Sequence, residues 1–203
     1  REERKIESGY FHTAGVSERV IPAGEPLSVE VLRGLEYRPA RQTVEVTAGA
    51  TRDLKVSLER LADWPARGFW SGDLHVHMNY GGAYRATPAT LRFQAEAEDL
   101  HAVFNLIVNK EQRIPDVRSI TGQPDPESTA ATLIRHDEEF HTSWWGHTSI
   151  LGLKDHLLLP LYAGYANTAA ASLHPSSVTV SDLARAQGAL VGALPERPQE
   201  EPA

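Results

Sequence analysis

The sequence contains no cysteine, and its acidic residues outnumber its basic ones. The lack of cysteine excludes disulfides, iron–sulfur clusters and cysteine-type zinc sites, so any bound metal must be held by His, Asp or Glu. The net charge of -7 argues against a nucleic-acid-binding surface. No apolar run approaches the length of a membrane span. We therefore expect neither a nucleic acid nor a membrane among the partners.

What is present is the composition of an ordinary globular protein, with 41% apolar and 23% charged residues. The length of 203 residues is enough for one medium domain or two small ones. The chain begins at Arg1 with neither an initiator methionine nor a signal-peptide pattern, so we expect a processed or partial product. The sequence leaves the compartment open, with an extracytoplasmic location, periplasmic or secreted, favoured over others.

Residues 10–60 show the alternation of apolar and polar residues that is typical of β-strands with one buried face. The alternating segments are residues 27–31, 43–47 and 54–59. Turn-forming Pro and Gly residues separate these segments. We predict that residues 1–66 form a small antiparallel β-sandwich-like module, and we find no catalytic pattern in it.

From residue 67 onward, strand-like segments alternate with helix-like ones. Thr87 and Pro88 are typical of an N-cap and a first helical residue. The apolar run AVFNLIV at residues 102–108 indicates a strand covered on both faces. The other expected elements are a strand end at 73–78, short strands at 133–134, 139–142 and 149–153, a helix at 180–187 and a strand at 189–194. We predict an α/β domain with parallel strands over residues 67–194, and a disordered, Pro-rich tail at 195–203.

Two histidines stand out in the stretch SGDLHVHMNYGG. On a strand, residues two apart point the same way, so His75 and His77 are expected to project side by side. Neutral imidazole suits Zn and its first-row relatives. Asp73 would lie on the same face, where it could orient one of the histidine rings.

A second group of metal-ligating residues follows in RHDEEFHTSWWGHTSILGL, residues 135–153. Within one strand, Glu139 and His141 would share a face. A carboxylate among histidines can bridge two metal ions and position a hydroxide between them, which is a common arrangement in metal-assisted hydrolysis. Successive strand ends that carry such residues are how a multi-ligand site is assembled.

Plainer interpretations of these residues stay open on spacing alone. A His-x-His pair is often a surface or structural feature. The polar run from His136 to Glu139 could be a solvated face, and the tryptophans Trp144 and Trp145 could belong to a core or an interface. The combination of both groups, in the order strand end, covered strand, carboxylate–histidine cluster, favours a metal site.

Longer segments carry a resemblance to a known family. RGFWSGDLHVHMNYGG, NLIVNKEQRIPD, EEFHTSWWGHTSILGL and TAAASLHPSSVTVSDLARAQGALVG resemble the CehA/McbA (carbaryl-hydrolase-like) branch of the PHP-domain metallohydrolases. The preceding VEVLRGLEYRPARQTVEVTAG is similar to the β-rich module of the same branch. The resemblance implies a (β/α)7 barrel with two or three divalent metals at the carboxyl ends of its strands. It also implies hydrolysis of esters, carbamates, amides or phosphoesters by metal-activated water.

The resemblance also implies roles for individual residues. The implied metal ligands are His75, His77, Glu139 and His147, with Glu139 as the carboxylate that bridges metals. The candidate catalytic residues are His141, which lines the site in the family, and the pair Asn109 and Lys110, which stands where the family usually has Asp-His. Zn is the first choice of divalent metal, although Mn and Fe suit the same ligands.

Three departures from the family pattern change the expectation for this chain. Ala83 stands where a further polar ligand is expected, and Ala193-Leu194-Pro195 replaces a His-Pro ligand segment. The later Asp-x-His pair does not appear. We therefore expect a partial PHP-type barrel, C-terminally truncated relative to the family and impaired as a hydrolase of small-molecule substrates. The alternative is a non-catalytic binding or structural module that retains the scaffold, and the exposed strand edges of a partial barrel leave room for a homo-oligomer.

Overall fold

The structure is a computed structural model that describes the main chain of residues 3–5 and, in full, residues 10–79, 86–109, 116–142, 145–157 and 174–193. It divides into two compact units, residues 1–72 with 92–101 and residues 73–91 with 102–203. Each unit is described separately. The predicted tail at 195–203 lies outside the described residues, and the predicted boundary between residues 66 and 67 stays a prediction.

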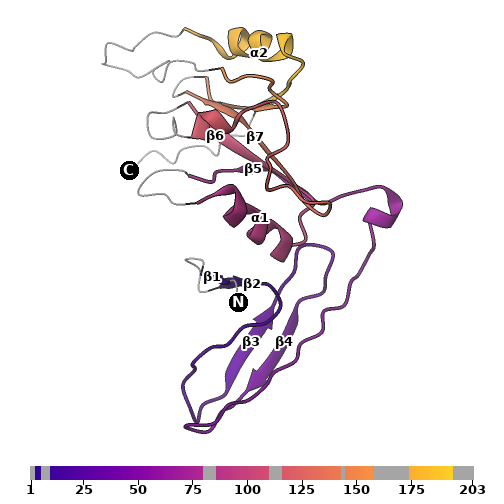
Figure 1. Cartoon of the computed structure of the whole chain (residues 1–203), viewed down its shortest axis with the longest axis vertical. Coiled ribbons are helices and arrows are strands. Elements are labelled where there is room, and N and C mark those ends of the chain that lie inside the picture. The colour runs from indigo at the N-terminus through magenta and orange to yellow at the C-terminus, as the bar shows by residue number, and fades with distance from the viewer. Residues whose placement is uncertain are drawn as a thin grey trace, which may run out of the picture. The chain divides into compact units, whose positions relative to one another are not determined.

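The first unit contains two antiparallel strand pairs. β1 (Glu3–Lys5) pairs with β2 (Phe11–Thr13), and β3 (Leu27–Val31) pairs with β4 (Ala40–Val44) in a register that sets Leu27 opposite Val44 (Figure 1). The predicted antiparallel pairing is therefore confirmed. A short 3-10 helix, η1 (Pro65–Arg67), follows later in the unit.

The third strand expected in this module, at residues 54–59, does not form. Residues 51–59 have no ladder, and the chain instead meets residues 36–38 through an isolated bridge between Tyr37 and Arg60. The described part of the unit thus holds two separate two-stranded sheets in place of the sandwich we expected. The physical reason is a shortage of core, because Val44 is the one buried apolar side chain between residues 10 and 72. Alternation alone does not supply the apolar area that two facing sheets need.

Ion pairs connect separate segments of the first unit. Arg60 reaches Asp99 at 2.6 Å and Glu36 at 3.5 Å, and Arg33 reaches Asp99 at 2.9 Å. Burial alone would raise the pKa of Asp99, but the hydrogen bonds and charges of the two arginines outweigh burial and lower it. Asp99 is thus held ionised between two cations.

The second unit contains a curled, open sheet of five strands in sequence order. The strands are β5 (Gly72–Val76), β6 (Ala102–Val108), β7 (Leu133–His141), β8 (His147–Leu151) and β9 (Leu190–Ala193) (Figure 1). β6 and β7 are parallel, whereas β7 with β8 and β8 with β9 are antiparallel. The α/β class is therefore confirmed, and the sheet is mixed.

The expectation of uniformly parallel strands was wrong for β8 and β9. Five residues, 142–146, join β7 to β8, and a parallel crossover needs a dozen or more. The two short strands expected at 133–134 and 139–142 are also one continuous strand, β7. The polar residues between them had suggested an interruption, but both edges of β7 are paired, which keeps this segment extended.

The first helix begins where the sequence predicted, and the second begins three residues before the expected residue 180. α1 (Pro88–Ala97) follows Thr87, whose hydroxyl accepts from the Thr90 amide at 3.2 Å. α2 (Ser177–Ala186) is capped by Ser176, and Gly188 follows its end with a φ of 84°. Within the described ranges, neither helix has the length and apolar character needed to cross a bilayer.

The core of the second unit lies on one face of the sheet. Its buried members are Ile107, Ile120, Phe140, Ile150, Leu153, Val180, Ala184 and Ala189. Five of these side chains come from β6, β7, β8 and α2, and Ile120, Leu153 and Ala189 come from the connecting segments, so α2 covers this face. Glu139 neighbours Phe140 on β7, and the two-residue period of a strand therefore directs its side chain to the opposite, concave face.

Candidate metal centre

Two histidine rings meet at the end of β5. His75 lies in the strand and His77 follows directly after it, so the strand period carries both rings to one side. Their Nε2 atoms lie 3.0 Å apart, and the ring planes are nearly perpendicular at 82°. The structure thus brings together the pair that the sequence singled out.

A buried carboxylate completes this group. Oε2 of Glu139 lies 3.2 Å from Nε2 of His75 and 3.0 Å from Nε2 of His77. Glu139 is only 2% exposed, whereas the two histidine side chains are 36% and 24% exposed. One ligand atom from each residue can be chosen so that all three lie within 4.8 Å of one another. Zn–N bonds of about 2.0–2.1 Å in a tetrahedral site place neighbouring ligand atoms roughly 3.3–3.4 Å apart, so this spacing suits one shared cation.

The tautomer of His77 follows from a main-chain contact. Its Nδ1 atom lies 2.8 Å from the carbonyl oxygen of Leu106, which can only accept a hydrogen bond. Nδ1 therefore carries the proton and donates it. In the neutral ring the lone pair is then on Nε2, the ring nitrogen nearest Glu139, where it could ligate a cation shared with that carboxylate; in the protonated ring Nε2 donates to Glu139 instead.

The second carboxylate oxygen of Glu139 faces a different histidine. Nδ1 of His147, on β8, lies 2.9 Å from Oε1 of Glu139. His141 stands opposite His147 in the β7–β8 ladder, and the centroids of these two rings are 3.6 Å apart. Glu139 is thus placed between two histidine groups, one on each oxygen.

The electrostatics keep this carboxylate in its charged form. Burial would raise the pKa of Glu139, but the hydrogen bond from His77 and the charges of His77, His147 and His75 outweigh burial. The pKa of Glu139 is therefore lowered from its ordinary value. An ionised carboxylate is the form that ligates a metal.

The remaining predicted site residues have mixed outcomes. Oδ1 of Asn109 accepts the main-chain N–H of His141 at 2.7 Å, so Asn109 holds the end of β7. Its Nδ2 is buried without a hydrogen-bond partner among the described residues. Lys110 and Ala83 lie outside the described residues. Asp73 accepts from the main-chain N–H of His75 at 2.9 Å, so it fixes that residue's backbone and not a ring as we expected.

The polar run from His136 to Glu139 is not a solvated face. All four residues are buried, and their side chains alternate between the two faces of the sheet. Burial raises the pKa of Asp137, which accepts from the main chain of Gly152 and Leu153 at 2.9 and 2.8 Å. Burial likewise raises the pKa of Glu138 to about 8, although it accepts an N–H from Leu157 at 2.7 Å. A segment with the composition of an exposed polar loop is therefore part of a buried strand.

Sequence reasoning also missed a set of buried polar side chains behind the site. Asn105 and His136 are both buried and lie 2.9 Å apart, and His136 continues to Asp125 at 2.9 Å. One signal was available. Asn105 is the single polar residue inside the apolar run AVFNLIV, and a polar group in a covered strand must find a partner.

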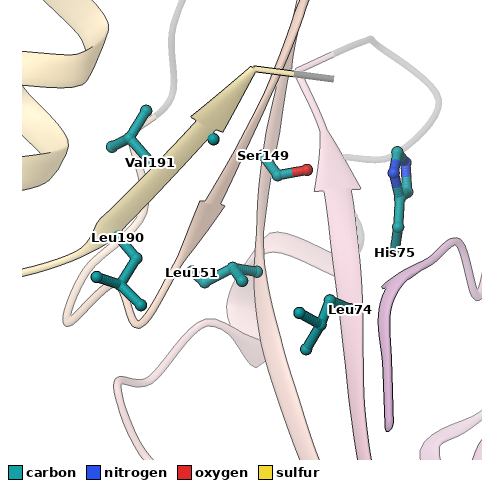
Figure 2. Close-up of a pocket in the computed structure, with 7 residues that line it drawn as sticks. Leu74, His75, Ser149, Leu151, Leu190 and Val191 are labelled. Carbon is teal, nitrogen blue, oxygen red and sulfur yellow. The ribbon is translucent and has the colours of Figure 1, made fainter. Parts of the chain in front are cut away.

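A hollow of about 320 Å³ adjoins the histidine pair. Its lining is mostly apolar, and the residues are Leu74, His75, Ser149, Leu151, Leu190, Val191 and Gly192. Figure 2 shows Leu190, Leu151 and Leu74 in a row across the view, with Ser149 and His75 above that row. The hollow thus has an apolar side next to a polar, metal-competent one.

Comparison of the chain with models of protein families, with curated proteins and with solved structures finds no match.

Proposed function

We propose that this chain is a metal-dependent hydrolase that acts on ester, carbamate, amide or phosphoester bonds of small molecules. The observation that carries the proposal is the convergence of His75 and His77 on Oε2 of Glu139, with His147 on Oε1 of the same carboxylate. Three imidazoles around one buried carboxylate form a ligand set for first-row divalent metals. Zn is the first choice, and Mn and Fe are alternatives.

The chain's own residues have separable tasks in this proposal. His75, His77 and Glu139 would hold one ion, and the second oxygen of Glu139 with His147 would extend the site toward another. The partial exposure of the histidines leaves the site open to water and substrate. When bound, such a cation supplies an activated water nucleophile and polarises the electrophilic oxygen of the substrate.

The fold and the adjoining hollow support the same proposal. We propose that the curled sheet corresponds to part of a PHP-type (β/α)7 barrel, on the strength of the motifs DLHVH and EEFHTSWWGHTSILGL and their order along the chain. A hollow of about 320 Å³ has the size of a small ligand pocket. Its apolar side would take a non-reacting substituent, while the scissile bond lies toward His75.

The test joins metal titration with activity measurements. The purified chain would be stripped of metal, titrated with Zn or Mn, and assayed on aryl esters, carbamates, amides and phosphodiesters. Metal-dependent turnover that is abolished in the double variant His75→Ala, His77→Ala supports the proposal. The control is His156→Ala, which removes a partly exposed histidine of the same unit that is not part of the cluster. Zn binding without turnover on any substrate class would favour a non-catalytic binding module.

A further inference from the structure

The buried side chain of Asn105 has an orientation that a single contact decides. Its Oδ1 atom lies 2.9 Å from the main-chain nitrogen of Met78, and a main-chain N–H can only donate. The amide of Asn105 must therefore turn its oxygen toward Met78 and its Nδ2 atom away from it. Asn105 is 1% exposed, so no bulk water can substitute for either contact.

This orientation decides the proton position on the next residue. Nδ2 of Asn105 lies 2.9 Å from Nδ1 of His136, and because Nδ2 donates, Nδ1 must accept. The proton of the neutral ring is therefore on Nε2, which lies 2.9 Å from Oδ2 of Asp125. All the hydrogen bonds of this series thus run in the same direction. Met78 donates to Asn105, Asn105 donates to His136, and His136 donates to Asp125.

The far end of the series is anchored independently. Oδ1 of Asp125 accepts from the main-chain N–H of Glu127 at 2.8 Å, and the Asp125 N–H donates to the carbonyl of Ile134 at 2.9 Å. Asp125 is thus held by its own loop and by β7. The carboxylate that accepts the hydrogen bond from Nε2 of His136 is therefore fixed in position.

The near end adjoins a proposed metal ligand. Met78 directly follows His77, and Leu106, which accepts from Nδ1 of His77, directly follows Asn105. Two successive residues of β6 therefore hold two successive residues at the end of β5, one through a carbonyl and one through an amide side chain. The β6–β7 register places Asn105 beside His136, on the face of the sheet opposite Glu139. The side chains of Asn105 and His136 therefore lie apart from the proposed metal ligands.

We propose that Asn105, whose amide is held between the Met78 N–H and the ring of His136, is a positioning residue that fixes the main chain directly after His77 from behind the sheet, and through it the ring of His77 against the Leu106 carbonyl. The inference rests on the proposed function in so far as His77 serves as a ligand. The competing interpretation is a satisfied buried polar group whose only effect is on folding. The two interpretations make different predictions for a substitution at Asn105. A positioning role changes the His77 ring signals and the metal affinity, whereas a purely structural role changes only the free energy of unfolding.

The first measurement uses the unaltered chain, free of metal. Long-range ¹H–¹⁵N correlation spectra report the tautomer of each imidazole, and they should show His136 protonated on Nε2 and His77 protonated on Nδ1. A His136 ring protonated on Nδ1 would overturn the proposal, because Asn105 would then have to turn its nitrogen toward Met78.

The second measurement compares two substitutions of similar size at one position. Asn105→Leu removes the acceptor for Met78, whereas Asn105→Asp keeps it, although its second oxygen then requires a proton on Nδ1 of His136. In Asn105→Leu the Met78 amide should lose hydrogen-exchange protection, the His77 ring signals should shift, and Zn affinity should fall about 10–100-fold. In Asn105→Asp, the Met78 amide should stay protected and Zn affinity should stay within roughly threefold, as expected when the support of a ligand is kept.

The matched control is Val103→Ala, which removes buried apolar volume from the same strand without touching the series. If Asn105→Leu binds Zn as tightly as Val103→Ala and leaves the His77 signals unchanged, the positioning role is wrong. A failure of the proposed function is distinct, because then the unaltered chain and Val103→Ala would not bind Zn either. In that event the shift of the His77 ring in the metal-free Asn105→Leu chain still decides the positioning role.

Discussion

Nε2 of His77 lies 3.0 Å from Oε2 of Glu139, although β6 lies between the strands that carry them. Neighbouring strands are about 4.8 Å apart, so a flat sheet would separate these two side chains by roughly twice that spacing at their bases. The curl of the sheet and the shared direction of the two side chains close the gap. The candidate site therefore depends on the shape of the sheet as much as on the identity of its ligands.

The two oxygens of Glu139 predict a hierarchy among the histidines. His77→Ala removes a ligand from the group of three around Oε2, so we expect it to abolish tight binding of the first Zn. His147→Ala leaves that group intact and should retain one Zn while reducing further uptake. Calorimetric titration gives the stoichiometry of each variant. Equal loss of the first ion in both variants would contradict the division of the site between the two oxygens.

Asn109 is predicted to secure the end of β7. Asn109→Leu leaves the His141 N–H without its acceptor, and an unsatisfied buried group costs about 1–3 kcal/mol of unfolding free energy. Asn109→Asp keeps an acceptor oxygen at the same place and should cost less. Urea unfolding measures the difference, and hydrogen exchange at the His141 amide shows whether the bond is lost. Equal stability of the two variants would count against this role.

The lowered pKa of Asp99 predicts acid sensitivity of the first unit. A carboxyl whose folded pKa lies below its unfolded value contributes stability above the unfolded pKa, and that contribution is lost as the pH falls through the folded pKa. Asp99→Asn should therefore cost about 1–3 kcal/mol near pH 7 and less at acid pH, as the pH falls through the folded pKa. Urea unfolding at both pH values tests this. Glu59→Gln is the control, because its pair with Arg38 is exposed and should be worth about 0–1 kcal/mol.

The core behind β8 predicts a contrast between two leucine-sized side chains. Ile150 is fully buried against α2, and Ile150→Ala should cost about 2–5 kcal/mol. Leu190 on β9 is 74% exposed, and Leu190→Ala should change the unfolding free energy by less than about 0.5 kcal/mol. Denaturant unfolding of both variants makes the comparison. A large effect at Leu190 would mean that another molecule covers it in solution.

Much of the local structure could be predicted because local chemistry decides it. Thr87 with Pro88 marks the start of α1 through a cap that needs no distant partner, whereas α2, capped by Ser176, begins three residues before the expected residue 180. The pairing of His75 with His77 follows from the strand period alone. By contrast, the antiparallel pairing of β8 was missed, although the expected strands at 139–142 and 149–153 left only six residues between them, too few for a parallel crossover.

What could not be predicted depends on which face of a strand is covered. His136, Asp137 and Glu138 have the composition of a solvated segment, and only the neighbouring strands and α2 make it an interior one. The same limit applies to Asn105 and Asp125, which are twenty residues apart in the chain and meet only through His136. Propensity and periodicity describe one segment at a time, whereas burial is a property of the assembled sheet.

The position of Glu139 between the histidines of β5 and β8 has a consequence for the spectra of a partly metal-loaded preparation. Its contacts reach His77 beyond β5 and His147 on β8, so a cation held among these side chains would tie the two flanks of the sheet together. A preparation that is partly loaded with a divalent cation would then contain tied and untied molecules side by side, and the amides of β5 should give two sets of signals whose intensities follow the loading.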